Sequence, residues 1–479
     1  MAETECRADG GHGERQRSPG RKAVTLYVLC TVPFIMVLGN SLLIPVLPEL
    51  QKALDTNLTR VGVLITLFSI PAGLIIPFSG FISDRSGRRA VIAPALALYG
   101  TGGLVAGVAA VLAANPWPWI VAGRILQGVG AGGTYQLAMA MASDIYTGPA
   151  RAWALGLLEA ANGLGKVIAP LAGAAAALLA WYAPFFLYGV LALPAAALVW
   201  WVAEEPKLDE KPQSLHEYGR TLAQIARQKG VYFLITSMAG FLVLGNLFGT
   251  LSLLSDMLER DQGIGVFGRG LLLAIPVLLM ASVAYTTGTI MQKQLPRYVG
   301  LTIPLGLGLA AAGIVALLLL DHWILRLAAV SLGTGVGTGL TLPSINVLIT
   351  STASRAERGI VTGIYGSLRF FGVAAGPPFY GWGADTGRLL LLLAVAGVLG
   401  VVALLQLFVV REEELLPAKL TGPAPEVSGQ MGSSGGKQLH QNGGQSRSHQ
   451  WSGGNPSQEG NAHHRADHQA DHDDRIGLK

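Results

Sequence analysis

The sequence predicts an all-α membrane protein with twelve transmembrane helices in two pseudosymmetric six-helix bundles. Only 13% of its 479 residues are charged and 51% are hydrophobic, whereas a soluble globular protein carries about 25% charged residues. The apolar residues form long blocks, and a helix needs about 20 such residues to cross a hydrocarbon core of roughly 30 Å. The 63 glycines fit this class, because helices in lipid approach one another through small residues.

The apolar blocks define the expected spans and the segments between them. In the first half the blocks cover residues 23–47, 60–83, 90–114, 117–142, 153–178 and 181–203, and in the second half 231–254, 266–291, 298–320, 324–351, 358–382 and 388–410. The first block is too long for a signal-peptide core, so we expect it to be retained as a helix. The predicted segments are a cytoplasmic tail (1–22), an N-terminal bundle (23–203), a cytoplasmic linker (204–230), a C-terminal bundle (231–411) and a disordered cytoplasmic tail (412–479).

The positions of the basic residues predict the orientation of the spans. If the N-terminus lies inside, the cytoplasmic connections contain most of the Lys and Arg residues, including the run around Arg88. The opposite side contains only Lys52, Arg60, Arg260, Arg269 and Arg388. Because Lys and Arg are enriched in cytoplasmic loops of membrane proteins, both termini are expected in the cytoplasm.

The two halves repeat short sequence patterns at nearly one offset. Val37–Asn40 recurs as Val243–Asn246 at an offset of 206 residues, and Gly128–Gly130 recurs as Gly335–Gly337 at 207. The fifth expected span also recurs at 207, with Arg151, Gly156, Gly165 and Pro170 matching Arg358, Gly363, Gly372 and Pro377. A duplicated bundle is therefore expected, and such repeats place a substrate site at their interface near the bilayer midplane.

Charged residues inside the spans are the strongest indication of function, because an ionised side chain at mid-membrane costs at least ~2.5 kcal/mol and marks a pathway or relay. Glu159 and Lys166 share one face of the fifth span. Burial disfavours the charged form of a carboxylate and a nearby cation favours it, a balance that allows proton exchange near neutrality. We expect Glu159 to carry a proton, with Lys166 taking part in the coupling. The alternative is a static Glu159–Lys166 pair that fixes helix packing.

Other polar side chains within the spans are candidates for lining the substrate cavity. Arg369 aligns with Asn162 at the offset of 207, so we expect both to face one cavity from opposite halves. The full expected set is Asn40, Gln136, Asn162, Asn246, Asn346 and Arg369. Each asparagine could equally bridge two helices through hydrogen bonds.

Four short motifs resemble those of the major facilitator superfamily. Gly80–Arg89 (GFISDRSGRR), between the second and third spans, is similar to the signature loop of that family. Arg124–Gly130 (RILQGVG) resembles its second motif, and Gly165–Gly173 (GKVIAPLAG) resembles the proline-glycine motif of its antiporter branch. Ile44–Leu50 (IPVLPEL) is similar to twelve-helix drug-efflux members. The resemblance covers about residues 23–411 and implies a drug:proton antiporter of the multidrug efflux type.

The resemblance assigns three further roles. In the antiporters of this family the second motif is associated with proton coupling, which implies that Arg124 takes part in the coupling; alternatively, Arg124 only bonds carbonyl groups across the bundle. The signature loop is expected to act as a conformational latch through Gly80, Asp84, Arg85, Gly87, Arg88 and Arg89. Asp84 would accept backbone N–H bonds at the start of the helix that begins near Arg358, with help from the helix dipole; alternatively, the arginines only fix topology. The helix-packing motif, Gly165, Pro170, Gly173, Gly372 and Pro377, permits close helix crossing and a kink, which suits a hinge or a seal between the halves.

These features together predict a secondary transporter that exports drugs or other small amphipathic compounds by alternating access, powered by a proton gradient. The expected partners are a small-molecule substrate, protons and the lipid bilayer of the bacterial cytoplasmic membrane, with no nucleic acid, and the expected state is a monomer. We expect no enzymatic activity, cofactor or metal, since no phosphate-binding loop, His/Cys spacing or nucleophile triad occurs in the spans. One alternative is a transporter of organic anions or a lipid flippase of the same fold. Another is a non-transporting membrane receptor or channel.

Overall fold

The computed structural model describes residues 19–205, 215–352, 358–387 and 389–409. The described residues form helices and contain no strand, which confirms the predicted all-α class. All of them belong to one compact unit, Met1–Gly422. The expected tail 412–479 and most of the expected tail 1–22 lie outside the described residues.

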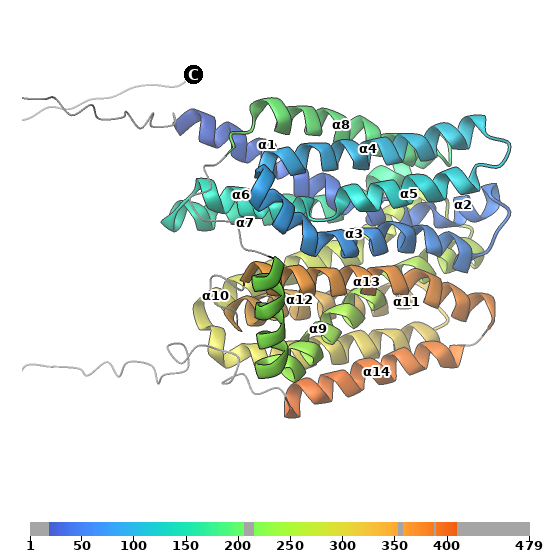
Figure 1. The fold of residues 1–479 in the computed structure, drawn as a ribbon. Helices are drawn as coiled ribbons and strands as arrows, with labels where there is room; N and C mark the ends of the chain where they lie inside the picture. Colours follow the sequence, from blue (N-terminus) through green and yellow to red (C-terminus); the bar gives the residue numbers. More distant parts are fainter. Residues whose placement is uncertain (1–18, 206–214, 353–357, 388, 410–479) are drawn as a thin grey trace, which may run out of the picture. The chain divides into compact units, whose positions relative to one another are not determined.

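A helical stretch covers each of the twelve expected spans (Figure 1). The helices of the first half are α1 (Pro19–Ser41), α2 (Leu47–Ala53), α3 (Leu58–Ser86), α4 (Arg88–Leu112), α5 (Trp117–Ala131), α6 (Thr134–Ile145), α7 (Gly148–Ala177) and α8 (Ala183–Val202). Those of the second half are α9 (Leu215–Arg260), α10 (Val266–Leu319), α11 (Trp323–Ala329), α12 (Val336–Thr352), α13 (Arg358–Asp385) and α14 (Leu389–Phe408). α10 covers two expected spans, and α9 begins within the expected linker 204–230.

Three of the expected spans contain a break in the regular α-helix. In the first span a short 3-10 turn, η1 (Ile44–Val46), separates α1 from α2 near Pro45. In the fourth span α5 ends at Ala131, and Gly133 has a φ of 87°, a left-handed conformation that favours glycine. In the tenth span α11 and α12 are joined by a π-helical segment, η2 (Val330–Gly335). The breaks in the fourth and tenth spans lie next to the polar residues described below.

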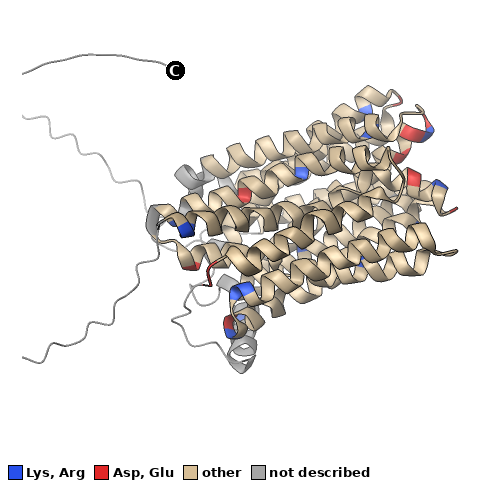
Figure 2. Cartoon of the chain, turned by 90° about the horizontal axis from the view of Figure 1, so that it is seen from above, with Lys and Arg blue, Asp and Glu red and all other residues tan. Residues whose placement is uncertain are grey.

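The distribution of side chains is that of a membrane protein. By length and hydropathy, eight helical stretches of the described residues could cross a membrane. Figure 2 shows Lys, Arg, Asp and Glu gathered at the two ends of the helices, with few charges between them. Large apolar side chains such as Leu74, Phe78 and Leu278 are exposed on the outer surface, where lipid would cover them.

The halves meet along two pairs of helices, α3 with α13 and α7 with α10. A Cβ atom on Gly62 would lie 2.9 Å from the backbone of Pro377, and one on Gly270 would lie 2.9 Å from the carbonyl oxygen of Pro170. Only glycine therefore fits at these crossings without a shift of the backbone. We call the end of the helices that carries Gly87 and Glu205 the linker end, and the end that carries α2 the far end (Figure 1).

Candidate functional site

A polar site lies where the two halves meet. The hydroxyl of Tyr135 on α6 donates a hydrogen bond to the carboxylate of Glu159 on α7. Glu159 is exposed rather than buried, so the burial expected from the sequence is not found. Lys166, two turns further along α7, lies within electrostatic range of both Glu159 and Arg369. Arg369 comes from α13 of the other half, and its guanidinium is within 3.5 Å of the side-chain oxygen of Asn346 on α12. The structure therefore brings together four of the residues predicted for proton coupling and the cavity, and adds Tyr135.

The charges of this site do not balance among the described side chains. Lys166 and Arg369 are cations, whereas Glu159 is the one carboxylate that acts electrostatically on Lys166. Arg369 forms no described ion pair, and its guanidinium lies 5.4 Å from the ring centre of Tyr365. The site therefore carries a net positive charge when all three groups are ionised.

Gln136 and Asn162 lie at helix contacts around this site. The Nδ2 atom of Asn162 donates to the carbonyl oxygen of Pro33 on α1 at 3.4 Å. A Cβ atom on Gly366 of α13 would lie 3.2 Å from the Nε2 atom of Gln136. The Oε1 atom of Gln136 is buried and has no hydrogen-bond partner among the described residues. The side chain of Gln136 thus faces the opposite half, and its Oε1 atom is free to accept a hydrogen bond from a bound molecule.

Arg124 is completely buried within the first half. Its guanidinium donates to the carbonyl oxygens of Leu64 (2.9 Å) and Gly39 (2.8 Å), and to the side chains of Gln127 (3.0 Å) and Asn40 (2.8 Å). Gly39 lies in the last turn of α1, where carbonyl groups lack helical partners. These are the contacts expected if Arg124 only bonds carbonyl groups across the bundle, and its part in proton coupling stays a prediction.

The predicted cavity residues Asn40 and Asn246 bridge helices. Besides binding Arg124, Asn40 donates to the hydroxyl of Ser69 at 2.7 Å. Asn246 is 1% exposed; it accepts a hydrogen bond from the hydroxyl of Tyr380 at 2.5 Å and donates to Thr334 at 3.4 Å. Both asparagines therefore have the contacts of the helix-bridging alternative.

The signature loop forms a compact ionic cluster at the linker end. The guanidinium of Arg88 lies 2.6 Å from Asp84 and 3.2 Å from Asp144, and it also donates to Ser83. Burial raises the pKa of the Asp144 carboxyl, and Arg88 opposes this effect. Among the described residues the ionic partner of Asp84 is Arg88; residues 353–357, which precede Arg358, lie outside that set. The predicted contact with the start of α13 therefore stays a prediction.

A carboxylate that sequence reasoning missed holds the start of α4. Glu205 accepts hydrogen bonds from the backbone N–H groups of Arg88 (2.6 Å) and Arg89 (2.8 Å). Gly87 precedes them with a φ of 96°, and a Cβ atom there would lie 3.0 Å from the Glu205 carboxylate. The N–H groups at a helix start favour an anion. The predicted type of contact occurs, but Glu205 supplies the carboxylate and α4 supplies the N–H groups.

Arg85 and Arg89 of the loop contact different parts of the first half. Arg85 lies over the ring of Phe81 and donates to its carbonyl oxygen at 3.1 Å. Arg89 donates to the carbonyl oxygen of Ala203 at 3.3 Å. A Cβ atom on Gly80 would have no neighbour within 4 Å among the atoms described.

The helix-packing motif lies at close helix crossings. A Cβ atom on Gly165 would lie 2.6 Å from Val37, and one on Gly173 would lie 2.8 Å from the carbonyl carbon of Leu42, so both fit α7 against the first span. In the second half Gly372 packs in the same manner on Phe241 of α9. Pro170 and Pro377 lie at the crossings between the halves described above.

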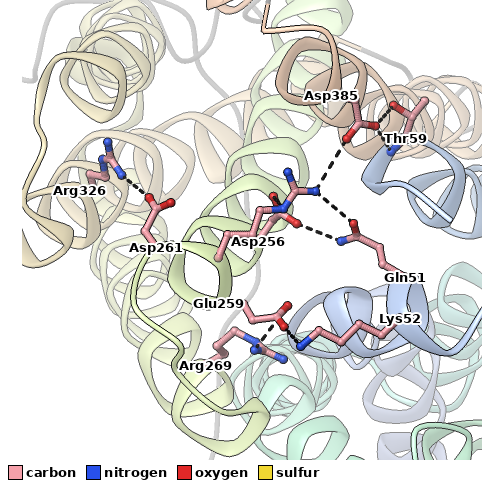
Figure 3. A network of polar contacts seen from close by, with 10 residues as sticks. Gln51, Lys52, Thr59, Asp256, Glu259, Asp261, Arg269, Arg326 and Asp385 are labelled. Carbon is pink, nitrogen blue, oxygen red and sulfur yellow. Dashed lines mark hydrogen bonds and ion pairs between the residues drawn. The ribbon is translucent and has the colours of Figure 1, made fainter. Parts of the chain in front are cut away.

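A network of polar contacts joins the two halves at the far end (Figure 3). Lys52 forms an ion pair with Glu259, and Arg269 forms one with Glu49. The remaining contacts between the halves involve Gln51, Thr59, Asp256, Arg260 and Asp385. The pair Arg326–Asp261 lies within the second half. Lys52, Arg260 and Arg269, three of the five basic residues that the sequence places on this side of the membrane, thus form contacts in this network. The spacing of residues within one helix could not reveal these contacts.

Comparison with known proteins gives consistent matches. The sequence model of the Major Facilitator Superfamily matches residues 29–377 and 301–442. The bacillibactin exporter of Bacillus subtilis (strain 168) is 33% identical over 357 residues, which cover 74% of this chain and 88% of that protein. The multidrug efflux protein YfmO of the same organism is 28% identical over 358 residues, which cover 73% of this chain and 82% of that protein.

Solved structures support the same fold. A bacterial homolog of the human lysosomal transporter Spinster, in an inward-facing and unoccupied conformation, superposes with a TM-score of 0.63 at 17% identity, covering 83% of this chain and 94% of that chain. The human organic anion transporter MFSD10 gives a TM-score of 0.62 at 19% identity, covering 81% and 100%. At these identities the likeness concerns the fold alone.

Proposed function

Since the chain belongs to the Major Facilitator Superfamily of transporters, we propose that it is a proton-coupled antiporter that exports small amphipathic compounds by alternating access. The observation that carries the proposal is Glu159, a carboxylate hydrogen-bonded to Tyr135 beside Lys166 where the halves meet. An ionisable group within a transmembrane bundle serves as a proton relay or pathway residue by default. Similarity to a bacillibactin exporter and a multidrug efflux protein supports export.

In the proposed cycle the charge state of Glu159 alters the contacts within the polar site. The ionised carboxylate accepts the hydrogen bond from Tyr135 and attracts Lys166. Protonation removes that attraction, so Lys166 and Tyr135 become available to other partners. Because Arg369 belongs to the other half, a change at Glu159 also changes the attraction between the halves, and this links proton binding to their rearrangement.

The same reasoning gives the proposed setting of the protein. The basic loops support a multi-pass protein of the bacterial cytoplasmic membrane with both termini inside. We propose that it acts as a monomer and takes its energy from the proton gradient without a bound cofactor.

A second candidate function is the export of organic anions. The net positive charge of Lys166, Arg369 and Glu159 favours it, because a cation in a site of low polarity is stabilised by an opposite charge. The two candidates differ in the charge of the compound that drives proton movement.

Proteoliposomes with a trapped pH-sensitive dye test both candidates, with ethidium as the cationic probe and 8-anilino-1-naphthalenesulfonate as the anionic probe. We expect probe-dependent proton flux in the wild type and none in Glu159→Gln, while fluorescence still reports probe binding. Asp321→Asn, which removes an exposed carboxylate, should keep the flux and serves as the matched control. Full flux in Glu159→Gln would refute its role as proton carrier. Flux with the sulfonate alone would support anion export.

A further inference from the structure

Apart from the pair Arg326–Asp261 within the second half, the polar contacts at the far end form two groups that differ in charge balance, and Figure 3 shows most of their residues. The first group contains Glu49, Lys52, Glu259 and Arg269, which are joined by the ion pairs Lys52–Glu259 and Arg269–Glu49 and by a 3.9 Å approach of Arg269 to Glu259. Two cations thus face two carboxylates. Arg269 is 1% exposed, so its charge is matched within the protein rather than by water.

The second group has one carboxylate in excess. Arg260 lies 3.0 Å from Asp256 and 3.9 Å from Asp385, so one cation serves two carboxylates. Glu259, whose own charge is matched in the first group, and Asp385 both act electrostatically on Asp256. The second group therefore carries a net charge of one negative unit when all of its groups are ionised.

Contacts between the two halves keep the carboxylates of the second group mostly buried. Asp256 accepts a hydrogen bond from Gln51 at 3.0 Å, and Asp385 accepts bonds from the backbone N–H (3.0 Å) and the hydroxyl (2.6 Å) of Thr59. Gln51 and Thr59 belong to the first half, whereas both carboxylates belong to the second. The Asp256 side chain is 4% exposed, but Arg260 is 52% exposed, so solvent weakens the compensation that this arginine provides.

These observations define what separation of the halves would change. With the far end closed, Asp256 is buried beside a second carboxylate, and both effects disfavour its charged form. In the closed form the hydrogen bond from Gln51 and the charge of Arg260 favour the ionised carboxylate, but burial of Asp256 has the larger effect and disfavours it. With the far end open, water would reach Asp256 and remove the effect of burial. A proton is therefore bound more favourably in the closed form than in the open form.

We propose that Asp256, together with Asp385 and Arg260, is a proton-uptake site that closes the far end of the transporter when it binds a proton. Acidification thus stabilises the closed form, which is the opposite of the effect expected if acid only broke the ion pairs of the network. In the first group each carboxylate is paired with a cation, which favours its ionised form. Its ion pairs are therefore lost only at a lower pH, and until then they keep the far end closed.

The proposal deepens the proposed function and rests on it, since a proton antiporter must load protons on the side from which they enter. If the far end faces outward, a proton taken up there after substrate release favours return to the form that is closed on that side. Asp256 would then act in the second half, in addition to Glu159 in the first.

The test measures the distance between the halves at the far end without any substrate. Spin labels are placed on Ala53→Cys and Gln262→Cys, two exposed positions of opposite halves, in the full chain with Cys6→Ser and Cys30→Ser. Double electron–electron resonance then measures the distribution of distances between the two labels, which gives the closed and open populations between pH 8 and pH 5. We expect the closed-to-open ratio to rise as pH falls, by up to about tenfold per pH unit for a single proton.

Matched variants identify the group that binds the proton. Asp256→Asn should be mostly closed already at pH 8 and should lose the rise, whereas Asp321→Asn should retain it. Glu159→Gln shifts the closed-to-open ratio itself, because Glu159 acts on the halves through the polar site, but the ratio should still rise as pH falls. The far-end site can therefore be confirmed even if Glu159 has no role in transport. An unchanged rise in Asp256→Asn, loss of the rise in Glu159→Gln, or opening of the wild type on acidification from pH 8 to 6 would each overturn the proposal.

Discussion

Substitution of Arg124 by lysine separates the two roles that its sequence allows. Arginine and lysine carry the same charge, but lysine has three donors on a single nitrogen and lacks the planar fork of arginine. Arg124 donates four hydrogen bonds in four directions, to Leu64, Gly39, Gln127 and Asn40. If the charge alone matters, Arg124→Lys should behave as the wild type does. If the fork holds the bundle together, the variant should be destabilised.

The magnitude follows from the bonds that lysine cannot replace. A hydrogen bond to a charged group contributes about 1.5–3 kcal/mol. An ammonium at this position loses at least one of the four bonds and fits the others less well, so we expect a loss of about 2–4 kcal/mol in the free energy of unfolding. The acceptor with most to lose is the Gly39 carbonyl near the end of α1, where the hydroxyl of Tyr188 would be left as the described side-chain donor.

Thermal unfolding of the purified protein in detergent, followed by tryptophan fluorescence, measures this effect. Arg21→Lys is the matched control, because the Arg21 side chain is 79% exposed and exposed ion pairs contribute at most about 1 kcal/mol. We expect Arg124→Lys to lower Tm clearly and Arg21→Lys to leave it unchanged. A wild-type Tm in Arg124→Lys would refute the structural reasoning, and a wild-type Tm with loss of proton flux would favour the coupling role.

Three further variants test the loop and the far-end network. Gly87→Ala should lower Tm, since its φ of 96° and ψ of 151° lie in a region that costs an L-residue about 1–3 kcal/mol and the methyl group would press on the carboxylate that caps α4. Gly80→Ala, inside α3 and with no described neighbour within 4 Å of its Cβ, should keep or raise Tm because alanine favours a helix interior, and a loss equal to that of Gly87→Ala would contradict this. Asp144→Asn should raise Tm at pH 7. Burial raises the pKa of Asp144, so the folded protein loses stability when this carboxyl ionises as pH rises, and asparagine cannot ionise. The gain should shrink as pH falls toward 4 in a Tm series, and a gain that grows would oppose the sign. Lys52→Gln should lower the closed-to-open ratio in the spin-label assay by less than about fivefold, because the Lys52 side chain is 72% exposed and solvent weakens its ion pair; a larger loss, or a rise in the ratio, would rule out this reasoning.

The sequence predicted the fold well because the membrane imposes a simple rule on it. A span needs about 20 apolar residues and satisfies its own backbone, so the spans could be read without knowledge of their neighbours. The exceptions are local. The break at Gly133 and the π-helical turn Val330–Gly335 depend on packing against other helices, which no periodicity within one segment encodes.

The site was predictable only where a single residue is unusual in its own span. Glu159, Lys166 and Arg369 stand out because charges are rare in apolar blocks, and the structure brings them together. Tyr135 gave no such signal, since a tyrosine is unremarkable in a span, and its role depends on its hydrogen bond to Glu159. Glu205 is separated from Arg88 by more than a hundred residues, so only the folded chain reveals the contact.

The two halves have the same framework but hold it together in different ways. At the offsets seen in the sequence, Asn40 corresponds to Asn246, and Arg124 corresponds to Ser331. Asn40 bonds Arg124, whereas Asn246 bonds Tyr380 and Thr334, and the buried hydroxyl of Ser331 has no partner among the described residues. The guanidinium thus has no counterpart in the second half, and there the helix adopts a π-helical turn at the corresponding position. A role that belonged to the repeated fold itself would be expected at both positions, so whatever Arg124 does is specific to the first half, where Glu159 also lies.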